Sequence, residues 1–130
     1  MLDLDLLPGE YAVCRLPAGS TLPATLTTGP DDKSVISVTW GVDELSIICP
    51  QDRVPDGAVA DTAWRCLRVT GLDLNLTMTG VLASLVGPLA DARVNIVTFS
   101  TYDTDYLLVP SVRLTEAVNT LTSVGHRIAR

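Results

Sequence analysis

The fold is decided by the stretch VLASLVGPLADARVNIVTFSTYDTDYLLVP, residues 81–110. Its first part is apolar at positions 81, 82, 85, 86 and 89, a spacing that predicts one buried face of a helix over residues 81–92. Pro88 lies inside that helix, removes one backbone hydrogen bond and is expected to kink it. Residues 94–99 and 105–109 are strand-like, and they are expected to pair with each other.

The flanking segments extend this pattern in both directions. Residues 72–76 alternate strictly between apolar and polar side chains, which predicts a strand, and residues 77–80 then form a turn. After the second strand of the pair, Ser111 is a candidate N-cap for another helix. Gly125 ends that helix in a left-handed conformation, and residues 126–130 are a candidate final strand. The buried stripe of this helix is predicted to be Leu114, Ala117, Val118 and Leu121.

The first half of the chain follows a similar but less regular order. Residues 11–16 predict a strand, and residues 35–40 and 45–49 predict a hairpin. The prolines and glycines of residues 17–30 argue for a loop or weak helix before this hairpin. A polar linker with at most one helical turn follows at residues 51–61, and residues 64–69 alternate like a half-buried strand.

The two halves overlay when the first is moved forward by 60 positions. Pro50 then falls on Pro110, Asp43 on Asp103 and Leu22 on Leu82. Such a repeat predicts an α+β protein of two βαββαβ units, residues 1–70 and residues 71–130, with antiparallel sheets and helices on one face.

Composition limits the classes of function. The chain has 130 residues, and 47% of them are apolar, so a folded core is expected rather than disorder. A net charge of −6 disfavours binding to nucleic acid. No apolar run approaches the roughly 20 residues of a membrane span, and the acidic N-terminus does not resemble a secretory signal. We therefore expect a cytoplasmic protein with no membrane partner.

The three cysteines, Cys14, Cys49 and Cys66, each lie in an apolar, strand-like segment, and no two of them form a CxxC pair. We interpret them as buried thiols that act as small hydrophobic side chains. A metal site or a redox pair is the alternative.

The second half resembles the ACT domain from residue 74 to about residue 125. The resemblance rests on TGVLASL (residues 79–85), followed by PLA (88–90), VNI (94–96) and STYDTDYLLV (100–109). Together with LPGEYAVCRL (residues 7–16), the last motif is similar to small stand-alone tandem ACT proteins. These proteins are related to aspartate kinase regulatory domains and to CASTOR-type arginine sensors. The resemblance implies two ferredoxin-like domains that bind amino acids at domain interfaces and pair side by side, so we expect a homodimer.

The start of the helix at residue 81 is one candidate ligand site. The residues concerned are Thr79, Gly80, Val81 and Leu82. Amide groups at a helix start lack intrahelical partners and attract a carboxylate. Many ACT domains that bind amino acids carry an acidic residue just before the turn glycine, where this chain has Thr79. Alternatively, Gly80 simply permits a tight turn.

The turn between the paired strands is the second candidate site. Its hydroxyls and carboxylates suit an ammonium or guanidinium group, with Asp105 or Asp103 as its acidic partner. Alternatively, the segment is an ordinary polar turn. The remaining candidate ligand-binding residues are Asn95, Ser100, Thr101 and Thr104.

Catalytic residues are scarce. His126 is the only histidine and is interpreted as a surface or packing residue rather than a catalyst. Asp103 and Asp105 have the spacing of an acid–base pair or a weak cation site, but nothing else completes either arrangement. The leading prediction is therefore a non-catalytic sensor of an amino acid that needs no metal or cofactor and acts on a regulated partner protein. A structural interaction module without a small ligand is the alternative, and an enzyme is the third.

Overall fold

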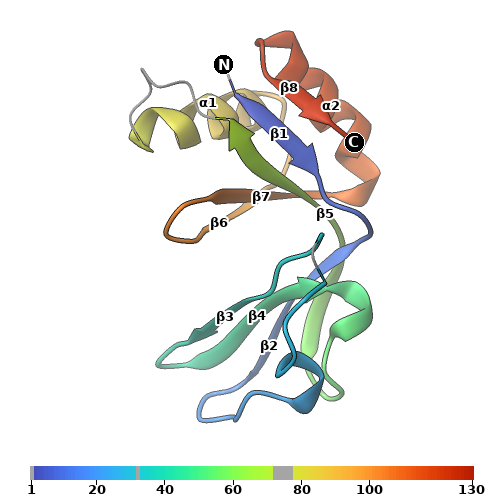
Figure 1. The fold of residues 1–130 in the computed structure, drawn as a ribbon, viewed down its shortest axis with the longest axis vertical. Coiled ribbons are helices and arrows are strands. Elements are labelled where there is room, and N and C mark those ends of the chain that lie inside the picture. Colours follow the sequence, from blue (N-terminus) through green and yellow to red (C-terminus); the bar gives the residue numbers. More distant parts are fainter. Residues whose placement is uncertain (1, 32, 72–77) are drawn as a thin grey trace. The chain divides into compact units, whose positions relative to one another are not determined.

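The computed structural model describes residues 2–31, 33–71 and 78–130. By its internal contacts the chain divides into two compact units (Figure 1). The first unit is Pro8–Trp64, and the second unit combines Met1–Leu7 with Arg65–Arg130. Strand β5 (Val59–Gly71) begins in the first unit and ends in the second.

The first unit is an antiparallel sheet. It contains β2 (Tyr11–Pro17), β3 (Ser37–Trp40), β4 (Glu44–Pro50) and the beginning of β5, in the order β3-β4-β2-β5. The predicted hairpin of β3 and β4 is confirmed. Alternate side chains of β2 and β4 point into one apolar cluster, which contains Cys14, Leu26, Leu45, Ile47 and Cys49.

Two 3₁₀ turns lie between the strands of the first unit. They are η1 (Ala24–Leu26) after β2 and η2 (Gln51–Arg53) after β4. The described residues of this unit contain no α-helix, so the helix-covered sheet expected for this half is not formed there. The physical reason is composition, because prolines and glycines around η1 interrupt the backbone hydrogen bonds of a longer helix.

The second unit is a mixed sheet with two helices. Its strands β1 (Asp3–Leu6), β6 (Val97–Ser100), β7 (Asp105–Pro110) and β8 (Arg127–Ala129) join the end of β5 in the order β6-β7-β5-β1-β8. Strand β1 is antiparallel to β5 and parallel to β8. Helices α1 (Met78–Asp91) and α2 (Leu114–Ser123) lie beside these strands (Figure 1). One apolar cluster joins helices and sheet through residues such as Leu4, Leu67, Leu85, Val109 and Leu121.

Helix boundaries differ from those predicted. Helix α1 begins at Met78, so residues 78–80 are helical rather than a turn. A glycine costs a helix only about 1 kcal/mol, which the buried stripe of α1 offsets. Ser111 is not the N-cap of α2, because η3 (Ser111–Arg113) comes first and Arg113 occupies the cap position. Gly125 has φ 101°, which confirms the left-handed helix end. The strand predicted at residues 72–76 lies outside the described residues.

The 60-residue offset recurs in the geometry of the two units. Strands β3 and β6 occupy positions 37–40 and 97–100, and the turns η2 and η3 occupy positions 51–53 and 111–113. Both hairpins are closed by the same backbone bond at 2.8 Å, which Gly41 N donates to Glu44 O and Thr101 N donates to Thr104 O.

Candidate functional site

The first group of predicted site residues lies in the first turn of α1. Val81 is buried in the core of the second unit, while Gly80 and Leu82 are half-buried. Because α1 begins at Met78, the amides of Val81 and Leu82 lie beyond the helix start, so they are not the unpartnered amides that the sequence predicted for a carboxylate. The Thr79 side chain lies outside the described part of the chain.

The second group lies in the β6–β7 hairpin. Ser100 Oγ donates a 2.6 Å hydrogen bond to Oδ1 of Asp105. Across the turn, Thr104 N donates to Thr101 Oγ1 at 3.2 Å, so the two threonines shape the turn. The structure thus brings together Ser100 and Asp105, and separately Thr101 and Thr104. Asp103 and Asn95 are exposed and have no hydrogen-bonding partner among the described residues.

Asp105 differs from the other acidic side chains of the hairpin because it is only 6% exposed. A carboxylate that leaves water loses much of its hydration free energy unless charges or donors replace the water. The Ser100 hydroxyl is one such donor, but no cationic side chain among the described residues pairs with Asp105. Asp105 is therefore suited to bind a positively charged group from outside the described residues.

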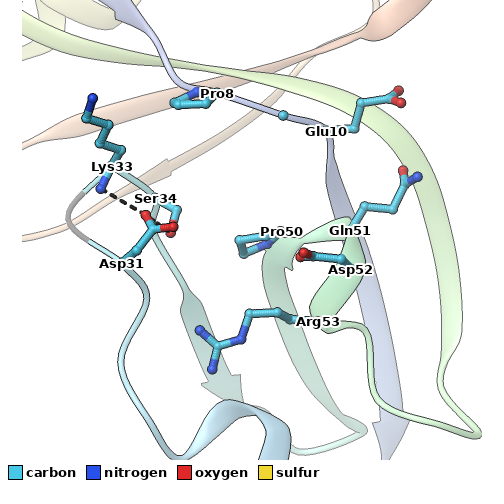
Figure 2. A pocket seen from close by; sticks show the side chains of 10 residues that line it. Pro8, Glu10, Asp31, Lys33, Ser34, Pro50, Gln51, Asp52 and Arg53 are labelled. Carbon is cyan, nitrogen blue, oxygen red and sulfur yellow. Dashed lines mark hydrogen bonds between the residues drawn. The ribbon is translucent and has the colours of Figure 1, made fainter.

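The first unit contains a groove that the sequence did not reveal (Figure 2). The groove has a volume of about 660 Å³ and is formed by three connecting segments: residues 8–10, residues 31, 33 and 34, and residues 50–53. Figure 2 shows Lys33 and Asp31 on one side of this groove and Gln51 and Asp52 on the other. No regular spacing links the three segments, so only the folded strands bring them together.

Hydrogen bonds outside the opening hold the walls of the groove. Gln51 N donates to Glu10 O at 2.9 Å, and Gln51 Oε1 accepts from Ala63 N at 2.7 Å. Oδ1 of Asp31 accepts from Lys33 N at 3.0 Å and from the Ser34 hydroxyl at 3.1 Å. The groove therefore exists before any ligand arrives.

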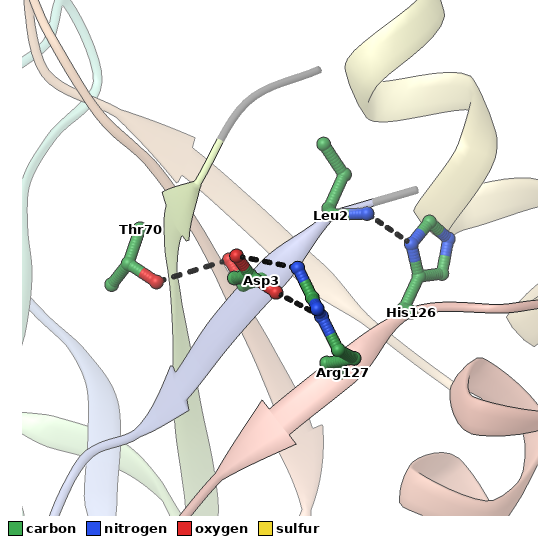
Figure 3. A network of polar contacts seen from close by, with 5 residues as sticks. All are labelled: Leu2, Asp3, Thr70, His126 and Arg127. Carbon is green, nitrogen blue, oxygen red and sulfur yellow. Dashed lines mark hydrogen bonds and ion pairs between the residues drawn. The ribbon is translucent and has the colours of Figure 1, made fainter.

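His126 has a structural position in the second unit (Figure 3). It is 4% exposed, and its Nδ1 accepts a 3.1 Å hydrogen bond from Leu2 N. Nε2 lies 3.0 Å from Ser84 O and must carry the proton to donate there. Ser84 is four residues before Pro88, which has no N–H, so His126 supplies the hydrogen bond that proline removes from α1.

A second set of contacts in Figure 3 joins β1 to its neighbours. Arg127 pairs with Asp3 through two bonds, Nε to Oδ1 at 2.6 Å and Nη2 to Oδ2 at 3.1 Å. Thr70 Oγ1 donates to Asp3 O at 3.2 Å. A Cβ at Gly71 would lie 2.6 Å from Asp3 Oδ2, so a larger residue there would require the Asp3 side chain to shift. These contacts hold β1 to β5 and β8.

The cysteines are free and buried, which confirms their interpretation as hydrophobic side chains. Burial raises the pKa of Cys66 to about 12. Burial, followed by the neighbouring Cys14 thiol, raises the pKa of Cys49 to about 12. The described residues contain no group of three histidine, cysteine or acidic side chains with the geometry of a metal site. None of the described helices has the length and apolar character of a membrane span.

Comparison with known proteins gives consistent matches. A family model described as ACT domain matches residues 59–123, and a model of an N-terminal domain matches residues 9–57. The human protein CASTOR3P is 31% identical over 108 residues, which cover 76% of this chain and 61% of that protein. The chain therefore spans about three-fifths of that relative's length.

Solved structures resemble the chain over nearly its full length. A crystal structure of an Agobacterium tumefaciens protein matches with a TM-score of 0.87 and 34% identity, covering 98% of this chain and 91% of that one. The ligand-free regulatory subunit of aspartate kinase from Thermus thermophilus matches with a TM-score of 0.63 and 12% identity, covering 94% of this chain and 97% of that one. At 12% identity, this second likeness concerns the fold alone.

Proposed function

Because this chain belongs to the ACT domain family, we propose that it is a non-catalytic regulatory module that binds an amino acid. The observation that carries the proposal is Asp105, a buried carboxylate held by the Ser100 hydroxyl without a cationic partner among the described residues. The ammonium group of an amino acid supplies the missing charge.

The rest of the ligand site follows from the predicted residues. The N-terminal end of α1, which begins at Met78, presents the positive end of the helix dipole to the ligand carboxylate. Thr101, Thr104 and Asn95 are polar and close in sequence to Asp105, and in this proposal they contact the side chain of the bound amino acid. Thr79 has no charge, so in this proposal the carboxylate at Asp105 is the main acidic contact.

The proposal is tested by measuring thermal stability and binding heat with each of the protein amino acids. A ligand that binds only the folded state raises the melting temperature. We expect Asp105→Asn to weaken binding of the active amino acid by at least about tenfold, because it removes a charge-assisted bond. The matched control is Asp103→Asn, an exposed carboxylate two residues away. Equal affinity of the two variants would contradict the proposed role of Asp105.

The proposal extends to the organisation of the chain. We infer two ACT-type repeats, residues 1–70 and 71–130, in a cytoplasmic homodimer that docks on a regulated partner protein. Support comes from the shared 60-residue offset of β3 with β6 and of η2 with η3. Among the described residues, β3 and β6 each pair with one strand, so a second copy can continue the sheet there. Light scattering after size-exclusion chromatography gives the mass that tests the dimer.

A protein-interaction module without a small ligand is the second candidate. It is favoured by Trp40 and Val42, which are 61% and 95% exposed at the β3–β4 turn. A partner captured equally well with and without amino acids, and lost in Trp40→Ser, would favour this candidate. Dependence on an amino acid would favour the first.

A further inference from the structure

We propose that Cys14 and Cys49, in the core of the first unit, form a two-sulfur binding site for the soft monovalent metal ion Cu(I). The ligand site proposed above lies on α1 and β7, which belong to the second unit. The inference therefore goes beyond the proposed function and does not require it.

The pairing of β2 with β4 places the two cysteines on one face of the sheet. Cys14 lies opposite Ile47, and Cys49 lies opposite Ala12, so the cysteines are diagonal neighbours on adjacent strands. Both side chains belong to the apolar cluster of the first unit, and they are 2% and 0% exposed. The Cys49 thiol donates a hydrogen bond to the sulfur of Cys14. Two sulfur atoms from different strands therefore meet inside an apolar environment.

The diagonal arrangement favours a bridging ion over a disulfide bond. The Cα atoms of diagonal neighbours on antiparallel strands are typically about 7–8 Å apart. A disulfide joins Cα atoms that are about 4.4–6.8 Å apart, so a direct S–S bond would require the strands to shift. An ion bound to both sulfur atoms lengthens the link by two metal–sulfur bonds. It also takes the place of the hydrogen atom that the two sulfur atoms already share.

The number and type of the donor atoms select the ion. Zinc in structural sites takes four ligands, and iron–sulfur clusters are also held by four, most often cysteines. The part of the chain that the structure describes contains no group of even three histidine, cysteine or acidic side chains suited to a metal. Around the cysteine pair lie apolar side chains, those of Leu26, Leu45 and Ile47. Soft thiolates prefer Cu(I), which is stable with two sulfur ligands in a line.

Binding releases the thiol protons. Two S–H bonds break, two sulfur–copper bonds form, and both protons pass to the buffer, so the copper site carries one negative charge. Burial and then the Cys14 thiol raise the pKa of the Cys49 thiol to about 12, the Arg53 guanidinium lowers it, and the Asp52 carboxylate raises it slightly. Arg53 therefore partly offsets the negative charge of the copper site. Five hydrogen bonds to the segment around η1 hold its guanidinium in place.

The test is a competition for Cu(I) in the absence of oxygen. The reduced full chain is titrated with Cu(I) held by bicinchoninate, because the colour of that complex reports the copper that the protein has not removed. Since the cysteines are buried, copper is added both to the folded protein and during refolding from urea. We expect each chain to remove one equivalent of copper. X-ray absorption at copper should then show sulfur neighbours and neither nitrogen nor oxygen.

Variants identify the sulfur atoms that bind. Loss of an outer partner of a metal ligand typically costs about 10–100-fold in affinity, so loss of a direct ligand should cost more. We therefore expect Cys14→Val and Cys49→Val each to lower the affinity for Cu(I) by at least about 100-fold. Cys66→Val is the matched control, since Cys66 is an equally buried thiol in the second unit. It should leave the affinity unchanged.

Four results would overturn the inference. The chain could leave all of the copper on bicinchoninate, or Cys14→Val could bind as tightly as Cys66→Val. X-ray absorption could show nitrogen or oxygen donors, and this measurement on the unmodified chain remains decisive if a valine variant does not fold. Finally, a disulfide between Cys14 and Cys49 in protein exposed to air would show that the sulfur atoms reach bonding distance without an ion.

Discussion

Among individual side chains, His126 shows how a proline inside a helix is compensated by a residue from elsewhere in the chain. Pro88 leaves the carbonyl of Ser84 without its helical donor, and the imidazole Nε2 lies 3.0 Å from that oxygen. The opposite ring nitrogen accepts from Leu2 N, so one neutral tautomer satisfies two buried backbone groups. Sequence alone left His126 as either a surface or a packing residue, because its partners are 42 and 124 positions away and no local pattern connects them.

His126→Leu is expected to lower the free energy of unfolding by about 2–4 kcal/mol, because two backbone groups lose their partners in the core. Pro88→Ala restores an N–H that can bond to Ser84 O, so in that background the cost should fall by about 1 kcal/mol. Urea unfolding of the two single variants and the double variant measures this coupling. Strict additivity of the two substitutions would contradict the role given to Ser84 O.

The candidate binding residues were only partly accessible to sequence reasoning. The β6–β7 hairpin was recognisable from its hydroxyls and carboxylates, but their spacing could not distinguish buried Asp105 from exposed Asp103. That difference arises because residue 105 begins β7 and faces inward, whereas residue 103 lies in the turn. The groove around Lys33 and Asp52 left no signal, since its walls are distant in sequence.

Among strands, β5 contains a local irregularity that shapes the groove. Its pairing with β2 shifts between Tyr11 and Val13, and Ala63 has φ 66°, in the left-handed region that favours glycine. The Ala63 amide is directed to Gln51, a residue of the groove wall. The bulge therefore fixes the wall, at the expense of backbone strain in β5.

Ala63→Gly should relieve this strain and raise the free energy of unfolding by about 0.5–1 kcal/mol, after the entropy cost of a glycine is included. Ala60→Gly in the same strand is the control, because Ala60 lacks a positive φ and should lose about 0.5–1 kcal/mol instead. Chemical denaturation compares the two. A loss of stability in both variants would show that Ala63 is not strained.

Helices and strands in which apolar side chains recur at a regular spacing were predictable from sequence, while their boundaries and partners were not. The apolar spacing located α1 and α2, because buried stripes of Val81, Leu85 and Leu89 or of Ala117 and Leu121 impose a period of 3.6. Sequence indicated the short elements that became η1 and η2, but it did not indicate that α1 begins at Met78. Propensity differences at helix ends are small enough for tertiary packing to decide.

For the chain as a whole, the buried thiols make the free energy of unfolding fall at alkaline pH. The thiol of a cysteine in the unfolded chain has a pKa of about 8.5, whereas burial raises the pKa of Cys66 to about 12. Between these values the unfolded state releases a proton that the folded state keeps. The free energy of unfolding therefore falls as pH rises, by about 1.4 kcal/mol per pH unit for this thiol.

Denaturant titrations from pH 8 to pH 11 should show this decline, and Cys66→Val should reduce it by removing the titrating group while nearly conserving volume. At pH 8 a thiol reagent such as Ellman's reagent should react slowly with the native protein and rapidly in urea. An unchanged pH slope in Cys66→Val would assign the alkaline decline to other groups.

The pairing of β1 with β8 has a consequence for biosynthesis. Asp3 lies opposite Arg127, 124 positions later in the sequence, so β1 gains this partner only after β8 has been synthesised. Pairing two strands so far apart in the sequence costs conformational entropy, because a long loop must close, and it slows folding. Residues 8–64, in contrast, contain all the strand partners of their own sheet. During translation the first unit can therefore form while the edge of β1 that pairs with β8 is still unpaired.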